Sequence, residues 1–265
     1  MEKFWHNPNE NHLNFIKTID IPPISEGGAP FPNDVFAPPE LDDKNAFFVT
    51  NDNVNKKGWK RDFESLTRLP ITHLSYYDDE KGWKIVVKGI QSANGITGTK
   101  KMVAANSADP PPENQLYISA ASGGMVRVFS RTYGSSELHP IQDVYFDGVT
   151  DNPSLSYPSQ SQLVVAVHVD PLAIYSNPAN PTHNKASPAG IFSFSTNQIG
   201  SGFYGHGYTG EVTVETVYLD RRGVLVNATT TSVLVESKQP GERGDLYVTG
   251  LMNAGIVKCK EFVLS

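Results

Sequence analysis

The sequence predicts an all-β protein, a jelly-roll β-sandwich with an extended N-terminal arm and one short helix. Residues 162–171 form the longest nearly unbroken apolar run, rich in β-branched residues and closed by Asp-Pro, which is typical of a strand buried on both faces. Glycine (22) and proline (19) are spread along the 265 residues and favour many turns over long helices. Roughly fourteen segments have strand character, whereas one short segment has helical periodicity.

Composition excludes several classes of protein. Apolar residues make up 38% of the chain, which is enough for a core, and the net charge is −6 without clustered Lys and Arg, so we expect no nucleic-acid site. The single cysteine, Cys259, cannot form a disulfide within the chain and is expected in the core. No apolar run is long enough to cross a bilayer, and the N-terminus lacks the pattern of a signal peptide, so no membrane partner is expected.

Residues 1–44 are predicted to form the extended arm. Proline pairs and Pro-x-Pro motifs here prevent a helix or a central strand. The arm nevertheless carries the aromatic residues Trp5, Phe15, Phe31 and Phe36, which a freely disordered tail would lack. We therefore expect the arm to lie against its own domain or a neighbouring subunit, and we expect a foldable domain to remain without residues 1–40.

The helix is predicted over residues 58–69. Trp59, Phe63 and Leu66 follow one another at helical spacing, and Pro70 ends the segment. A helix of about ten residues is stable only when it packs on a larger surface, so we expect this apolar face to be covered.

Residues 45–265 are predicted to form a single jelly-roll domain with additional C-terminal strands. Asn94-Gly95 predicts a hairpin turn. No repeat appears at a fixed period, which argues against a propeller. The predicted strands cover residues 46–50, 71–77, 83–90, 101–105, 116–120, 125–132, 141–146, 163–169, 191–194, 211–219, 224–227, 232–236, 246–248 and 256–264.

The sequence identifies no catalytic, cofactor-binding or metal-binding residue, and we expect no enzyme and no cofactor. The histidines lack the short spacings of zinc proteases; a cupin-type metal site would be sought first at His73, His168 and His206. Glu211 and Glu215 would face the same side of a strand but lie about 13 Å apart, too far for a glycosidase pair.

Two exposed loops are candidate binding elements. Arg243-Gly244-Asp245 follows a turn-like segment, and this tripeptide binds receptors of the integrin type when it is exposed. Phe203, Tyr204 and Tyr208 lie among glycines, where aromatic rings can stack on sugars; the alternative is that they pack between the sheets.

The chain resembles the capsid proteins of small picorna-like RNA viruses, including insect viruses. Residues 63–70 are similar to the short helix ending in Leu-x-Arg-x-Pro that precedes the strands of such subunits. Residues 122–128 are similar to an Arg-Gly-Gly-x-Arg-Tyr run, although the leading Arg and the Tyr are absent. The likeness covers residues 1–222 and does not extend to residues 223–265.

The resemblance implies an eight-stranded jelly roll that assembles with copies and sister subunits into an icosahedral shell. It implies a structural protein of the virion, assembled in the host cytoplasm, with other capsid subunits as partners and a host receptor as a candidate partner. The Trp5, Phe15, Phe31 and Phe36 side chains would then contact neighbouring subunits. The alternatives are a carbohydrate- or receptor-binding β-sandwich, such as a lectin-like or phage receptor-binding module, and a jelly-roll enzyme of glycosidase or metal type.

Overall fold

A computed structural model describes most of the chain. The described residues are 1–7, 12–55, 59–99, 114–170, 188–199, 212–223, 225–226, 228–237, 244–250 and 255–262. Within them the regular structure is mainly strand, with one α-helix, so the all-β prediction is confirmed. Also within them, no helix is both long enough and apolar enough to span a membrane.

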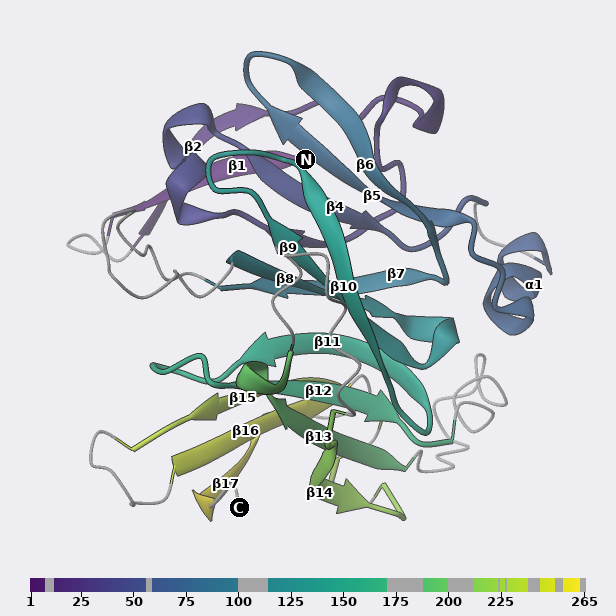
Figure 1. The fold of residues 1–265 in the computed structure, drawn as a ribbon, viewed down its shortest axis with the longest axis vertical. Helices are drawn as coiled ribbons and strands as arrows, with labels where there is room; N and C mark the ends of the chain where they lie inside the picture. Colours follow the sequence, from purple (N-terminus) through teal and green to yellow (C-terminus); the bar gives the residue numbers. More distant parts are fainter. Residues whose placement is uncertain are drawn as a thin grey trace.

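The described strands form five antiparallel sheets, and hydrogen-bonded neighbours are consecutive in the sequence (Figure 1). The N-terminal hairpin consists of β1 (Glu2–Asn7) and β2 (His12–Thr18). The first four-stranded sheet contains β3 (Pro32–Phe36), β4 (Phe47–Asn51), β5 (Thr72–Asp78) and β6 (Gly82–Ile90). The second contains β7 (Ala93–Gly98), β8 (Asn114–Ala120), β9 (Met125–Arg131) and β10 (Leu138–Tyr145). The third contains β11 (Val149–Leu155), β12 (Gln162–His168), β13 (Ala189–Ser195) and β14 (Glu215–Asp220). The last contains β15 (Thr229–Val235), β16 (Gly244–Gly250) and β17 (Val257–Phe262).

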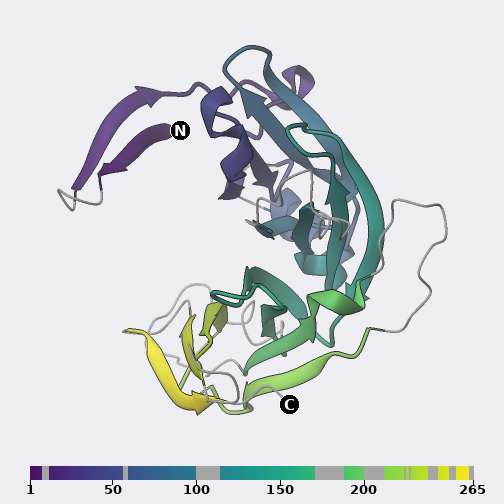
Figure 2. The same ribbon diagram turned by 60° about the vertical axis from the view of Figure 1, so that its left-hand side comes forward.

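Successive sheets pack face to face, each separated from the next by its own apolar layer. One buried cluster joins the first and second four-stranded sheets, another joins the second and third, and a third joins the third and last. The first strand of each sheet also contacts the first strand of the next sheet: β3 contacts β7, β7 contacts β11, and β11 contacts β15. Figure 2 shows the sheets following one another in an arc. Consecutive four-stranded meanders that meet along their first strands are arranged like the blades of a β-propeller.

The jelly-roll prediction is therefore corrected. A jelly roll is built from Greek keys, in which strands distant in the sequence become neighbours, whereas each described sheet here is a simple meander. The absence of a fixed-period repeat in the sequence does not exclude a propeller-like order of sheets, because such an order does not require equal repeats. The first strands of the four sheets begin at residues 32, 93, 149 and 229, so loops of unequal length hide the period.

Residues 162–168 of the apolar run form β12, which is buried on both faces, as predicted. Leu163, Val165 and Val167 contribute to the layer against the second four-stranded sheet, while Val164 and Ala166 contribute to the layer against the last sheet. Each of these five side chains is fully buried. Both faces of this strand lie between neighbouring sheets, which explains why its sequence does not alternate.

The N-terminal region differs from the predicted arm. Residues 32–36 form β3, the first strand of a four-stranded sheet, and the strand accommodates Pro32 because it lies at the sheet edge and begins at the proline. Phe36 is 5% exposed and packs with Phe48 and Leu74. Removal of residues 1–40 would take away β3 and a core side chain, which argues against the prediction that a foldable domain remains without them.

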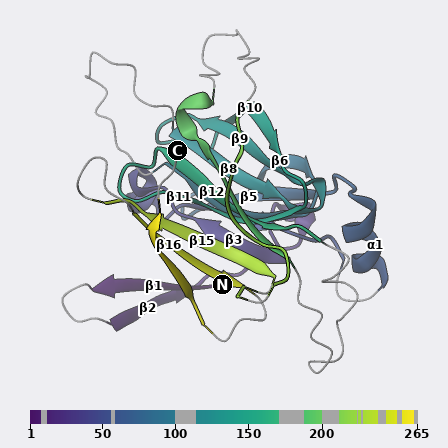
Figure 3. The same ribbon diagram turned by 90° about the horizontal axis from the view of Figure 1, so that it is seen from below.

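The predicted helix is present as α1 (Trp59–Thr67), at the periphery of the molecule (Figure 3). Its expected buried face is not covered, because Trp59 is 73% exposed and Phe63 is 53% exposed. A polar contact holds the helix instead: the buried Glu64 carboxylate accepts hydrogen bonds from the backbone N–H groups of Val54 and Asn55. The hydrogen bonds from the turn before the helix to the Glu64 side chain thus attach α1 to the rest of the molecule in place of apolar packing.

Most of the predicted strands are present in the structure with different ends, and the structure contains further strands that were not predicted. The segments predicted near residues 46, 71, 83, 116, 125, 141, 163, 191, 232, 246 and 256 correspond to β4, β5, β6, β8, β9, β10, β12, β13, β15, β16 and β17. The strands β1, β2, β3, β7 and β11 were not predicted. The predicted strand at 101–105 lies outside the described residues, and the segment at 211–219 is strand only from Glu215.

Candidate functional site

The starts of the four adjacent first strands, β3, β7, β11 and β15, meet and bring polar residues together. On β7, the backbone N–H of Ile96 donates to Asp34 Oδ2 of β3 at 2.9 Å. A Cβ added at Gly95 would lie 2.5 Å from the Cα of Asn152 on β11. The Nδ2 of Asn152 donates to the carbonyl of Thr230 on β15 at 2.9 Å. We use the name inner-strand centre for the polar residues at these strand starts, which are Asn33 and Asp34 of β3, Asn94 of β7, and Asp151 and Asn152 of β11.

Asp34 contributes a carboxylate that is fixed by the backbone. Its Oδ1 accepts the N–H of Val35 at 2.8 Å, and its Oδ2 accepts the N–H of Ile96. Burial raises the pKa of Asp34, hydrogen bonds from these two N–H groups oppose that shift, and the charge of Asp151 raises it further. No basic side chain is among these causes, so the charge of Asp151 acts on Asp34 without a lysine or arginine to offset it.

Asp151 contributes a second carboxylate, which is held by a histidine. Asp151 is 8% exposed, and its Oδ2 lies 3.1 Å from Nε2 of the buried His168. A neutral imidazole that donates from Nε2 leaves Nδ1 as an acceptor, and this buried Nδ1 has no hydrogen-bond partner among the described residues. His168 therefore orients the Asp151 carboxylate from behind, as outer groups do around metal-binding carboxylates.

Asn94 contributes a side-chain oxygen with no partner. The Oδ1 atom of Asn94 is buried and accepts no hydrogen bond from any described residue. The Asn-Gly pair here does not form the predicted turn but lies within β7. Gly95 is required for the close approach to Asn152, because any side chain would collide with its backbone. The glycine therefore serves packing between the first strands, and the asparagine provides a polar group at their junction.

The donor set of the inner-strand centre consists of hard oxygen atoms. Carboxylate and amide oxygens suit Ca²⁺, which accepts six to eight oxygen ligands in flexible geometry. Among the described residues, no three His, Cys, Asp or Glu side chains gather as a metal site would require. A cation here would need asparagine amide oxygens in addition to the two carboxylates, and such a set of oxygen donors suits calcium better than zinc or iron.

The histidines considered for a cupin-type site are not brought together where they are described. His73 lies on β5, and its Nε2 is 2.9 Å from the carbonyl of Gly28. His168 lies two sheets away on β12 and pairs with Asp151. His206 lies outside the described residues.

The other predicted binding residues have mixed outcomes. Arg243 lies outside the described residues, whereas Gly244 and Asp245 begin β16. The Asp245 carboxylate forms a 2.7 Å ion pair with Lys258 on β17. This tripeptide's receptor role stays a prediction. Phe203, Tyr204, Tyr208 and Glu211 lie outside the described residues.

The aromatic residues of the predicted arm occupy different environments. The backbones of Trp5 and Phe15 lie in β1 and β2, and nothing is described of their side chains. Phe31 is half-buried, and Phe36 is buried within its own chain, so Phe36 is not available to a neighbouring subunit. The intersubunit role of the other three stays a prediction.

Sequence reasoning missed the inner-strand centre because its residues resemble turn formers. Asn33-Asp34, Asn94-Gly95 and Asp151-Asn152 are typical turn pairs when each is considered alone. The signal that could have found them is their recurrence, since one such pair lies near the start of the first strand in each of three successive sheets.

Comparisons with known proteins give only distant similarities. No family model and no curated protein matches the chain. It is similar to a luciferin-regenerating enzyme, with a TM-score of 0.43, 16% identity, and coverage of 83% of this chain and 53% of that one. It is similar to a functionally unknown protein from Desulfotomaculum acetoxidans DSM 771, with a TM-score of 0.43, 14% identity, and coverage of 97% and 68%.

A third similar structure is an α-L-arabinanase from Penicillium chrysogenum complexed with arabinobiose. Its TM-score is 0.33 and its identity 12%, with coverage of 91% of this chain and 81% of that one. The chain spans about half the length of the luciferin-regenerating enzyme. At these TM-scores the similarities carry no argument about function, which must come from the site itself.

Proposed function

We propose that the inner-strand centre binds a divalent cation of the calcium type and that the protein is a cation-dependent hydrolase. The observation that carries the proposal is the buried Oδ1 of Asn94, which has no partner among the described residues, on the strand whose Ile96 N–H binds the Asp34 carboxylate, together with the electrostatic coupling of Asp34 to Asp151. An orphaned buried acceptor costs about 1–3 kcal/mol, and two neighbouring carboxylates add electrostatic repulsion. A bound cation would relieve both costs at once.

The exposure of the site supports a role in chemistry. Asn33 is exposed and Asn152 is half-buried, so one side of the centre is accessible while Asp151 and His168 are buried behind it. A cation held in this way keeps positions for water and for a substrate oxygen. Bound Ca²⁺ would polarise a carbonyl or phosphoryl oxygen as a Lewis acid. The residues of this chain would fix its position, and the His168 contact would hold the Asp151 carboxylate in orientation.

Calorimetric titration of the EDTA-treated protein tests the cation site. We expect saturable Ca²⁺ binding with a Kd below about 1 mM and weaker Mg²⁺ binding, because Mg²⁺ demands stricter octahedral geometry. Asn94→Ala is expected to weaken Ca²⁺ binding at least about tenfold. Asn197→Ala, at an exposed asparagine outside the centre, is the matched control and should bind like the parent protein. Equal binding by the two variants would contradict the proposed site.

Hydrolysis assays test the chemistry separately. With p-nitrophenyl acetate and p-nitrophenyl phosphate as probes, we expect Ca²⁺ to restore turnover of one of them after EDTA treatment. The probe that responds identifies whether the polarised oxygen is acyl or phosphoryl. If Ca²⁺ binds and raises Tm but neither probe is turned over, the cation is structural and the hydrolase proposal fails.

The functions predicted from the sequence stay predictions. A capsid subunit would need intersubunit contacts, and a carbohydrate-binding module would need the loops that lie outside the described residues. The described sheets are meanders and so do not support the jelly roll that the capsid interpretation implies. The inner-strand centre supports neither function specifically, so the cation-dependent enzyme is the function that the geometry supports best.

A further inference from the structure

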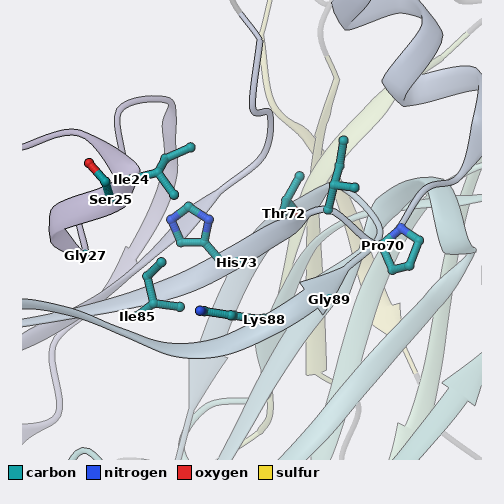
Figure 4. Close-up of a pocket in the computed structure, with 10 residues that line it drawn as sticks. Ile24, Ser25, Gly27, Pro70, Thr72, His73, Ile85, Lys88 and Gly89 are labelled. Carbon is teal, nitrogen blue, oxygen red and sulfur yellow. The ribbon is translucent and has the colours of Figure 1, made fainter.

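A cavity lies apart from the inner-strand centre, on the side formed by the third and fourth strands of the first four-stranded sheet. Its volume is about 620 Å³, within the range of about 300–1,000 Å³ that is usual for small-molecule sites. Residues of β5 and β6 line it together with the short 3₁₀ helix η1 (Ile24–Glu26) (Figure 4). Its apolar wall is formed by Ile24, Pro70, Ile71 and Ile85.

The cavity lining carries positive charge without a negative side chain. Lys88 lines it, and no aspartate or glutamate does. Within the described part of the chain Lys88 forms no ion pair, unlike Lys17 and Lys258. Figure 4 shows its amine directed toward the space between His73 and Ile85. The cavity therefore presents an uncompensated positive charge beside an apolar wall.

His73 supplies a fixed neutral partner at the same place. Burial lowers the pKa of His73, the hydrogen bond to the Gly28 carbonyl opposes that shift, and the Lys88 charge lowers it further. The neutral ring donates from Nε2 to Gly28, which leaves Nδ1 as an acceptor. The ring cannot compete with Lys88 for an anion, so the positive charge in the cavity belongs to Lys88 alone.

We propose that this cavity is a binding site for a small amphipathic carboxylate, with the hydrocarbon part against Ile24, Pro70, Ile71 and Ile85 and the carboxylate at Lys88. This inference goes beyond the proposed hydrolase and does not depend on it. The apolar contacts supply most of the affinity through buried area, and the lysine selects an anionic head group. An uncharged or cationic molecule with the same chain would lose that selection.

Calorimetric titration with octanoate, octan-1-ol and octylamine tests the proposal in buffer containing EDTA. We expect octanoate to bind saturably and more tightly than octanol, and octylamine to bind least. Lys88→Met, which keeps the apolar stem, should weaken octanoate binding about 2- to 5-fold, and Lys88→Arg should retain it. Lys84→Met is the matched control, since Lys84 is on the same strand but lies over the Tyr76 ring outside the cavity lining.

Filling the cavity gives a second, independent test. Ile85→Trp should abolish saturable octanoate binding; Ser25→Trp, at an exposed position of η1, serves the same purpose if the first variant fails to fold. The proposal is overturned if octanol binds as tightly as octanoate, if Lys88→Met and Lys84→Met behave alike, or if a folded cavity-filling variant still binds octanoate. Failure here leaves calcium binding at the inner-strand centre unaffected, so the two sites are tested separately.

Discussion

Replacing Glu40 by alanine is expected to destabilise the protein by about 3–5 kcal/mol, because it leaves a buried guanidinium without its counter-charge. Glu40 forms an ion pair with Arg131, the last residue of β9, and the two side chains are 4% and 1% exposed. The Nε and Nη2 atoms of Arg131 have no hydrogen-bond partner among the described residues. The arginine therefore depends on Glu40 for its compensation. Urea unfolding monitored by circular dichroism measures the effect.

Two controls separate the lost charge from lost packing. Glu137→Ala removes the carboxylate of the exposed Glu137–His139 pair and should cost no more than about 1 kcal/mol. The double variant Glu40→Ala/Arg131→Met removes both charges, and it should recover most of the stability lost in Glu40→Ala. A Glu40→Ala variant within about 1 kcal/mol of the parent would show that the buried pair is not what joins residues 39–44 to β9.

Replacing Asp151 by asparagine is expected to weaken Ca²⁺ binding at least about 100-fold, since it removes one of two carboxylates from the inner-strand centre while keeping its shape. The thermal stabilisation that Ca²⁺ gives the parent protein should disappear in the variant, because a ligand that no longer binds the folded state cannot shift its equilibrium. Differential scanning calorimetry with and without Ca²⁺ measures this.

The control for this variant is Asp147→Asn. Asp147 is exposed and lies four residues before Asp151 in the chain. Its replacement by asparagine removes the same negative charge as Asp151→Asn. Its Ca²⁺-dependent increase in Tm should equal that of the parent protein. If Asp151→Asn retained the full increase, Ca²⁺ would have to bind elsewhere and the assignment of the inner-strand centre would be wrong.

Local sequence patterns were sufficient to predict the elements whose residues by themselves indicate the type of secondary structure. Residues 162–171 predict a strand buried on both faces, because an apolar β-branched run can be satisfied only between two layers. The helix at residues 58–69 was also predictable from its spacing and from Pro70. Its exposed Trp59 and Phe63 were not, since periodicity identifies an apolar face but not what covers that face.

The arrangement of the sheets was not predictable from the same evidence. A meander and a Greek key use similar strands, and the difference lies in which strands become neighbours. The repeat of four strands is concealed because the first strands begin at uneven intervals. The strand β3 was missed because Pro32 and the prolines on either side of the strand argue against a central strand, although an edge strand accepts a proline.

The candidate site was hidden for a related physical reason. Asn, Asp and Gly favour turns because of their local hydrogen bonds and backbone freedom. At residues 94–95 and 151–152 the same properties serve contacts between strands that are far apart in the sequence. Only the meeting of the first strands distinguishes the two uses, and that meeting depends on the packing of whole sheets.

X-ray diffraction from crystals grown with Ca²⁺, with the ion identified by its anomalous scattering, tests the central claim most directly. We predict one strong peak at the junction of β3, β7 and β11. It should lie about 2.3–2.6 Å from side-chain oxygens of the inner-strand centre, with Asn94 and Asp151 among the ligands. A peak at another place, or an inner-strand centre in which a water molecule alone contacts Asn94 Oδ1 at saturating Ca²⁺, would contradict the account.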